Sequence, residues 1–358
     1  MKQFVIYGIL LSCFGIYSQE TYKRTLKLMG SRFDITVVAA NEDQAHKYID
    51  LAVAEISRIE TLISSWDPDS QTSLINKNAG IRPVKVDKEL FELIQRSKHI
   101  SRLTDGAFDI SYASMDNIWR FDGSMTKMPT EDVIKASVDK VGYERIILDE
   151  KEQTVFLKLK GMKIGFGAIG KGYAADKAKR LLKETGVPAG IINASGDLNT
   201  WGRQINGDDW SVAIKNPLNK NKVYALLPVY EKAVVTSGNY EKRVSFNGKT
   251  YSHIIDPRTG YPSTGLVSVS VFTNSAELAD ALATSIFVMG KAVGLDFINQ
   301  LEGIECILVD DHGKVHYSKG IDHKHIENEK VNNRSVSNNK FEFDLMPGRK
   351  RIRKSKSK

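Results

Sequence analysis

Helix-like and strand-like stretches follow one another along this chain without the regular strand–helix–strand alternation of a parallel sheet. Residues 26–39 alternate apolar and polar side chains, interrupted by Met29 and Gly30, and predict one or two strands. From Asn41, a predicted N-cap, apolar residues recur at helical spacing up to Trp66. This mixture predicts an α+β fold with mixed or antiparallel sheets and packed helices.

The same patterns predict the later elements. Helices are expected from Asp87 towards Thr104, from the glycine-rich segment 165–172 through about Thr185, over Glu277–Met289 and over Val293–Leu301. Strands are expected near Ile146–Leu148, Val155–Leu159, Ile307 and Val315, and from Ile191 to about Val271, with Asn206-Gly207 and Asn247-Gly248 as hairpin turns. Residues 105–130 show little periodicity and predict an irregular segment.

The first residues have the composition of an export signal. Lys2 precedes an apolar run from Phe4 to Tyr17, which is too short for a comfortable membrane span, and polar residues follow. We expect residues 1–19 to be a signal peptide and the protein to be exported to the periplasm. In the alternative, Leu10-Leu11-Ser12-Cys13 has the spacing of a lipoprotein signal that anchors the protein to the membrane through Cys13.

The formal net charge of +8 is unevenly distributed along the chain. From Gly320 to Lys358 there are eleven Lys and Arg against five Asp and Glu, so about +6 of the charge lies in this stretch. We expect residues 321–358 to form a basic, disordered tail and residues 20–320 to form one folded domain. Because the body of the chain is nearly neutral, no groove for nucleic acid is expected.

A glycine-rich segment, Gly165-Phe-Gly-Ala168-Ile-Gly-Lys171-Gly172, leads into one of the predicted helices. Glycines let the backbone approach a ligand closely, and the N–H groups at a helix N-terminus favour a phosphate. Lys171 adds a positive charge, but Gly172 stands where a P-loop requires Ser or Thr. The segment by itself is compatible with phosphate binding or with a tight strand-to-helix turn.

Asp280 and Thr284 are four residues apart in a predicted helix whose other face is apolar. An Asp and a Thr among small apolar residues are costly to bury unless something binds them. Carboxylate and hydroxyl oxygens suit a hard cation such as Mg²⁺. Alternatively, Asp280 hydrogen-bonds a neighbouring loop.

Three further segments carry polar residues suited to a site. His253 precedes the rigid turn Asp256-Pro-Arg-Thr-Gly-Tyr-Pro262, and a neutral imidazole there could accept a proton from a hydroxyl nucleophile. Thr104–Asp109 has the turn residues of a loop at the edge of a ligand site, and Asn193–Asp197 follows a buried strand. Each segment alone is equally explained as a turn.

Together these segments resemble the ApbE family, the FAD:protein FMN transferases. The similarity runs from about Leu28 to Val315. It is carried by Met29-Gly30, Ser65–Ser70, Thr104–Asp109, Gly167–Asp176, Thr236-Ser-Gly238, Ser252–Gly260 and Ala279–Thr284.

The resemblance implies an ApbE-like fold with an FAD cleft and a Mg²⁺ ion held by the carbonyl of Ala168 with Asp280 and Thr284. It implies that His253 is the catalytic residue. It also implies FAD contacts from Met29, Trp66, Ala107, Phe108, Asp109, Gly165, Lys171 and Ile255. Gly165 is a departure, because the family usually has Asp there and this chain therefore lacks one carboxylate contact to FAD.

The expected activity is Mg²⁺-dependent transfer of FMN from FAD to a Thr or Ser hydroxyl of an acceptor protein, with release of AMP. The expected acceptor is an exported or membrane redox protein. Two alternatives stay open: a Mg²⁺-dependent FAD pyrophosphatase, and an exported FAD-binding protein without catalysis.

Overall fold

The computed structural model describes residues 19–215, 223–239, 243–246 and 248–321. The predicted signal peptide and the predicted basic tail lie almost entirely outside these residues. Within them the chain combines antiparallel sheets with packed helices, so the predicted α+β class is confirmed.

A large sheet forms the centre of the molecule, and every neighbouring pair of its strands is antiparallel. In spatial order its eight strands are β1 (Glu20–Leu28), β2 (Ser31–Ala39), β6 (Gly190–Ala194), β7 (Asp197–Trp201), β10 (Ala233–Gly238), β13 (Leu266–Thr273), β14 (Glu305–Asp310) and β15 (Val315–Tyr317). Three smaller sheets are β3 (Val84–Lys85), β5 (Thr154–Leu157) and β4 (Ile146–Asp149); β8 (Trp210–Lys215) with β9 (Val223–Val229); and β11 (Arg243–Phe246) with β12 (Lys249–Ser252).

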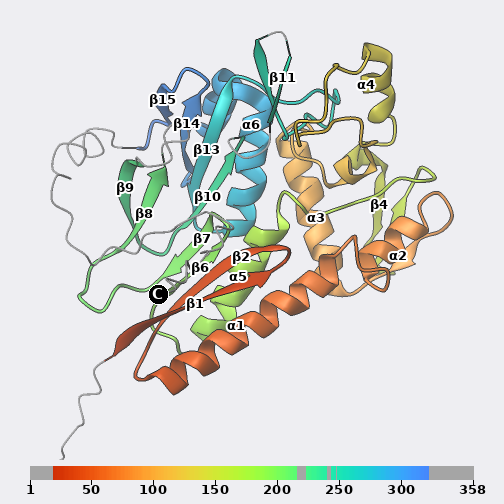
Figure 1. The fold of residues 1–358 in the computed structure, drawn as a ribbon. Helices are drawn as coiled ribbons and strands as arrows, with labels where there is room; N and C mark the ends of the chain where they lie inside the picture. The colour runs from red at the N-terminus through yellow and green to blue at the C-terminus, as the bar shows by residue number, and fades with distance from the viewer. Residues whose placement is uncertain (1–18, 216–222, 240–242, 247, 322–358) are drawn as a thin grey trace, which may run out of the picture.

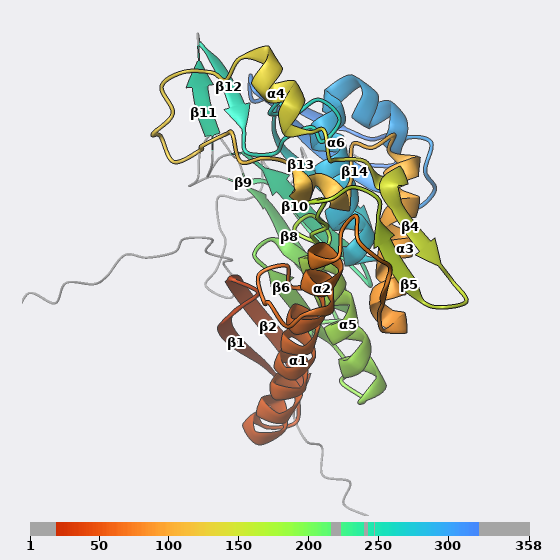
Figure 2. The same ribbon diagram turned by 90° about the vertical axis from the view of Figure 1, so that its right-hand side faces the viewer.

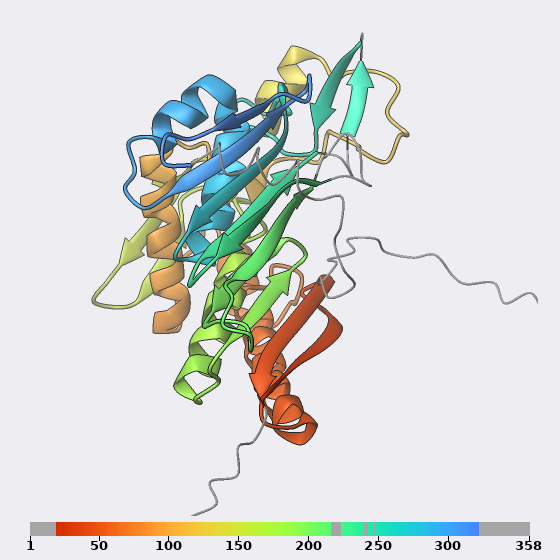
Figure 3. The ribbon, with the colours of Figure 1, turned by 90° about the vertical axis from the view of Figure 1, so that its left-hand side faces the viewer.

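Helices cover one face of the large sheet (Figures 1 and 2). The α-helices are α1 (Glu42–Ile63), α2 (Gln71–Lys77), α3 (Lys88–Leu103), α4 (Glu131–Ser137), α5 (Gly170–Glu184) and α6 (Ala276–Ile298). α1, α5 and α6 pack on the sheet, and Figure 3 shows the sheet from its other face, with α5 and α6 behind the strands. α3 lies beyond them, and its Arg96 pairs with Glu277 of α6.

Two layers of apolar side chains hold this arrangement together. Between the sheet and the helices lie fully buried residues such as Phe33, Ile56 and Phe287. On the other face, Trp210 of β8 and Val234 of β10 belong to one buried apolar cluster. Burial of a large aliphatic or aromatic side chain contributes about 1.5–3 kcal/mol, so these layers fix the sheet between its two coverings.

A local signal explains the start of α1 but not that of α3. Asn41 caps α1 as predicted, and its side chain accepts a hydrogen bond from Gln44 N at 2.9 Å. Asp87 precedes α3 but makes no side-chain cap bond, because its carboxylate accepts from the Gln71 side chain instead. The two predicted late helices form one element, α6, kinked at Gly290 (φ 78°, ψ 176°).

One predicted hairpin turn is wrong and the other is confirmed. Asn206-Gly207 joins β7 to β8, but β7 is already flanked by β6 and β10, so the chain leaves the large sheet and β8 pairs with β9. Gly248 (φ 76°) lies in the β11–β12 hairpin, where Phe246 pairs with Lys249. Asn247 lies outside the described residues.

Among the described residues, α6 alone is long and apolar enough to cross a membrane. Its residues Ala279, Leu282, Ile286 and Phe287 are fully buried against the sheet. A core helix of a folded domain has the same composition, and the packing of α6 identifies it as one.

Candidate functional site

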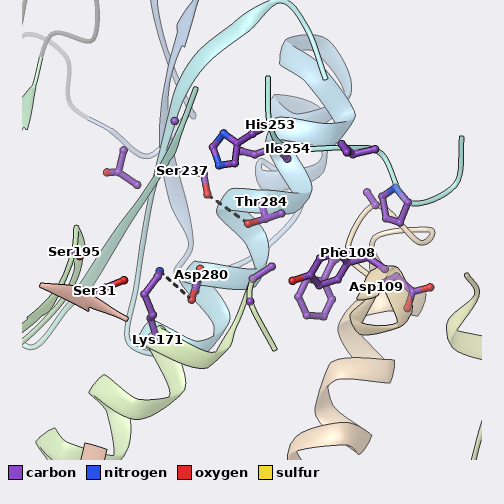
Figure 4. A pocket seen from close by; sticks show the side chains of 18 of the residues that line it. Ser31, Phe108, Asp109, Lys171, Ser195, Ser237, His253, Ile254, Asp280 and Thr284 are labelled. Atoms are coloured by element: carbon purple, nitrogen blue, oxygen red, sulfur yellow. Dashed lines mark hydrogen bonds and ion pairs between the residues drawn. The ribbon is translucent and has the colours of Figure 1, made fainter. Parts of the chain in front are cut away.

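A cavity of about 790 Å³ opens where the N-terminal end of α5, one face of α6 and several loops meet (Figure 4). Its volume lies in the range of small-molecule and cofactor sites. Its lining comprises Gly30–Arg32, Ala107–Asp109, Tyr112, Met115, Gly167, Ala168, Lys171, Ser195, Thr236–Gly238, His253–Ile255, Pro257, Asp280 and Thr284. Segments far apart in the sequence therefore build one site.

Nine of the twelve residues predicted from the sequence line this cavity. They are Ala107, Phe108, Asp109, Ala168, Lys171, His253, Ile255, Asp280 and Thr284. The other three, Met29, Trp66 and Gly165, are not among the described residues that line the cavity. Trp66 is 93% exposed. Met29 adjoins the lining residue Gly30, and a Cβ at Gly165 would lie 3.1 Å from Ala113 Cβ. The FAD contacts assigned to these three residues stay predictions.

α5 lies very close to α6 at Gly172. Its backbone N–H donates to Asp280 Oδ2 at 3.2 Å. A Cβ atom at position 172 would lie 2.1 Å from the carbonyl oxygen of Ala276, a distance that no side chain tolerates. The close contact between the two helices therefore explains why position 172 is Gly and not the Ser or Thr that a P-loop requires.

Two buried carboxylates and the half-buried ammonium of Lys171 meet where these helices touch. The Lys171 ammonium contacts the Asp197 carboxylate and lies 3.9 Å from Asp280 Oδ2. Both carboxylates are buried, and their burial raises the pKa of each. Burial opposes the charge of Lys171, but Asp197 and Asp280 outweigh it and raise its pKa. One lysine cannot neutralise two carboxylates, so the ionised site carries an excess negative charge.

The oxygen atoms around Asp280 suit a hard divalent cation. Thr284 Oγ1 lies 3.4 Å from Ser237 Oγ, and Ala168 lines the same cavity (Figure 4). The described residues contain no group of three or more His, Cys, Asp or Glu arranged so that it could hold a metal ion. A cation here would therefore take a carboxylate together with hydroxyl, carbonyl and water oxygens, as Mg²⁺ does. The excess negative charge of the ionised site favours such an ion.

His253 lies directly after β12, at the start of a rigid turn. Asp256 N donates to Tyr261 O at 2.9 Å, and Gly260 N donates to Asp256 O at 2.8 Å. The imidazole contacts Phe121 edge-on, with ring centroids 6.5 Å apart. Figure 4 shows His253 beyond Ser237 on the α6 side of the cavity. The turn thus holds an imidazole in the wall of the cavity that also contains the candidate cation site.

The chain matches the ApbE family model over residues 29–308, which include every element that lines the cavity. This protein belongs to the ApbE family. It is 32% identical over 292 residues to a FAD:protein FMN transferase of Klebsiella pneumoniae (strain 342), covering 81% of this chain and 89% of that protein. It is 28% identical to a FAD:protein FMN transferase of Treponema pallidum (strain Nichols), covering 87% and 90%.

Solved ApbE structures have the same fold. The ApbE protein of Thermotoga maritima superposes with a TM-score of 0.76 at 28% identity, covering 84% of this chain and 97% of that one. The flavinyl transferase ApbE of Pseudomonas stutzeri gives a TM-score of 0.74 at 25% identity, covering 84% and 95%. The resemblance predicted from the sequence is thereby confirmed.

This ApbE-family site contains residues to which sequence reasoning assigned no role. Asp197 is the direct partner of Lys171, whereas the sequence indicates only that small polar residues follow a strand there. Ser195 (φ 55°) lines the cavity from the β6–β7 turn and donates to Arg32 O at 3.0 Å. The signal that could identify them is the group of small polar residues in Asn193–Asp197, directly after a buried strand.

Asp109 has a structural task besides the predicted one. Its Oδ1 accepts from Ser111 N and its Oδ2 accepts from Tyr143 N, both at 2.7 Å. Burial raises the pKa of this carboxyl, and the backbone hydrogen bonds oppose that effect. Both oxygens hold the loop on which Ala107 and Phe108 line the cavity.

Proposed function

We propose that this protein transfers FMN from FAD to a Thr or Ser hydroxyl of an acceptor protein, with Mg²⁺ and with release of AMP. The observation that carries the proposal is the buried contact between Asp280 and the N-terminal turn of α5, beside Lys171. This contact places the oxygen atoms that could bind a cation beside the N-terminus of α5, which is suited to a phosphate. The relatives named FAD:protein FMN transferase support the same reaction.

The proposed reaction is a single phosphoryl transfer. The acceptor hydroxyl oxygen attacks the phosphorus of the FMN half, and the bond from that phosphorus to the bridging oxygen breaks. AMP leaves with that oxygen, and FMN remains joined to the protein through a phosphoester. His253 takes the proton of the attacking hydroxyl and acts as the general base.

The remaining residues bind and orient the diphosphate. Gly167, Ala168 and Lys171 line the cavity, and the Lys171 ammonium would hold the phosphate oxygens. Asp280, Thr284 and the carbonyl of Ala168 would hold Mg²⁺. When bound there, Mg²⁺ supplies neutralising charge to the diphosphate. The size of the cavity is compatible with a ligand that extends towards Phe108 and Ile255.

The direct test combines the purified protein, FAD, MgCl₂ and candidate acceptor proteins. We expect AMP in solution and an acceptor whose mass has increased by one FMN phosphoester. AMP with free FMN in the absence of an acceptor would instead identify a pyrophosphatase. Intact FAD after prolonged incubation, bound tightly, would identify a binding protein without catalysis.

We further propose that the protein works outside the cytoplasm on an exported or membrane redox protein. The supporting observation is the charged and apolar N-terminal sequence, in which Cys13 offers a lipid-anchor alternative. Fractionation of cells that produce the full chain is expected to find it in the periplasm or at the membrane. Loss of membrane association in Cys13→Ala would select the lipid anchor, and recovery in the cytoplasm would refute export.

A further inference from the structure

Asp176 connects the two helices that form the candidate cation site, although it does not line the cavity. It lies on α5, and its carboxylate accepts three hydrogen bonds from the start of α6. The donors are Ser275 Oγ at 2.8 Å, Ala276 N at 2.9 Å and Glu277 N at 2.9 Å. The first N–H groups of a helix lack intrahelical partners, and a carboxylate is favoured beside them.

The position of Asp176 is fixed from a third element. Asn199 of β7 is fully buried, and its Nδ2 donates to Asp176 Oδ1 at 2.5 Å. Lys179 Nζ in turn donates to Asn199 Oδ1 at 3.0 Å. Two residues earlier on the same face of β7, Asp197 contacts Lys171. The strand therefore contacts α5 at two positions, Lys171 and Asp176.

The spacing along both helices links this contact to the candidate cation site. Gly172 and Asp176 are four residues apart on α5, and both lie against Ala276 in the first turn of α6. Ala276, which Asp176 caps, is one turn before Asp280. The clearance at Gly172 is so small that a methyl group would collide with Ala276. A small shift of α6 would therefore displace Asp280 relative to Lys171 and Ala168.

We propose that Asp176 is a positioning residue for the cation site: by capping α6 from α5, it fixes Asp280 and Thr284 against the glycine-rich turn. This inference rests on the proposed function in one respect only: it assumes that Mg²⁺ binds at Asp280 and Thr284. A residue that served stability alone would, when replaced, lower the melting temperature without changing Mg²⁺ affinity. A positioning residue lowers Mg²⁺ affinity even where the protein is fully folded.

The test compares Asp176→Ala with a cap variant remote from the cavity. Asn41→Ala is the matched control, because Asn41 caps α1 through its side chain and does not line the cavity. Calorimetric titration of MgCl₂ into each protein with saturating FAD gives the Mg²⁺ dissociation constant, and thermal unfolding gives the melting temperature. We expect Asp176→Ala to bind Mg²⁺ about 10- to 100-fold more weakly. Asn41→Ala should match the wild type within a factor of about two, because its cap lies outside the cation site.

A second variant covers the case in which Asp176→Ala does not fold. Asp176→Asn keeps the shape and one acceptor oxygen but places an NH₂ group against donors of α6, so an intermediate loss of Mg²⁺ affinity is expected. High MgCl₂ should restore turnover in both Asp176 variants, since the ligands themselves are intact. It should not restore turnover in Asp280→Ala.

The outcomes separate this inference from the proposed function. If the wild type binds Mg²⁺ with FAD and Asp176→Asn binds it equally well, Asp176 is a structural cap only and the inference is wrong. If the wild type itself shows no Mg²⁺ binding in the presence of FAD, the cation site fails and the proposed function fails with it.

Discussion

The Nζ atom of Lys171 lies 3.9 Å from Oδ2 of Asp280, across the contact between the first turn of α5 and the second turn of α6. The same ammonium contacts Asp197, so two buried carboxylates share one cation. A divalent cation bound beside Asp280 would bring further positive charge and relieve the remaining repulsion. The predictions below test this arrangement and the fold that produces it.

Replacing Asp280 should remove activity without unfolding the protein. In Asp280→Ala the Lys171–Asp197 pair is left neutral, so we expect a melting temperature within a few degrees of wild type. Mg²⁺-dependent FMN transfer should fall below about 1% of wild type. Asp296→Ala, which removes an exposed carboxylate from the same helix, is the control and should keep full activity. Activity retained in Asp280→Ala would remove this residue from the site.

Replacing His253 should slow the chemical step while leaving FAD binding nearly unchanged. In His253→Ala no imidazole is available to take the hydroxyl proton, so turnover should fall about 10²- to 10⁴-fold. The FAD dissociation constant, measured by flavin fluorescence, should change less than about threefold because the phosphate-facing groups are untouched. A large loss of FAD affinity with unchanged turnover would assign His253 to binding instead.

A methyl group at Gly172 should separate α5 from α6. The added Cβ would lie 2.1 Å from Ala276 O, and relief of this clash requires movement of the backbone. We expect Gly172→Ala to lower the free energy of unfolding by about 1–3 kcal/mol in urea titrations. Gly165→Ala is the control, since its nearest new contact is the Ala113 side chain at 3.1 Å. Equal stability of the two variants would contradict the close helix contact.

Glu89 should make stability depend on pH in acid. Partial burial would raise its pKa, but hydrogen bonds from Arg58, Lys177 and Tyr173 outweigh burial and lower the pKa to about 2. A depressed carboxyl pKa stabilises the fold above the unfolded-state value, and this stability is lost as pH falls towards about 2.

Glu89→Gln should therefore unfold more easily than wild type at pH 7, by about 1–2 kcal/mol. The difference should shrink below about pH 4 and vanish near the folded-state pKa. Glu92→Gln, on the same helix with only an exposed Lys88 partner, should show almost no difference. Urea unfolding at pH 7, 4 and 3 measures all three proteins. A gap that persists unchanged at low pH would show that the Glu89 charge is not its cause.

Trp66 should contribute to FAD binding by stacking, as the family resemblance implies. Its side chain is 93% exposed, so its removal should not affect the fold. We expect Trp66→Ala to weaken FAD binding about threefold to tenfold, and Trp66→Phe to keep most of the affinity. Equal affinities in all three proteins would leave Trp66 without a role in this site.

Much of the fold could be predicted because its signals are local. The cap at Asn41 and the apolar spacing after it specify α1, and the φ requirement of Gly248 specifies the β11–β12 hairpin. The Asn206-Gly207 turn was predicted wrongly because strand pairing depends on which edges are free. β7 has no free edge, and this is a property of the whole sheet.

By itself, the sequence determined the α+β class, the helix faces and the residue types at the site. Periodicity, capping and family motifs depend on residues that are close together in the chain. Only the tertiary structure decided that Asp197 pairs with Lys171 and that Asp176 caps α6. These contacts join residues 26 and 100 positions apart. No local sequence pattern indicates such long-range contacts, because they depend on how α5, α6 and β7 pack around the shared core.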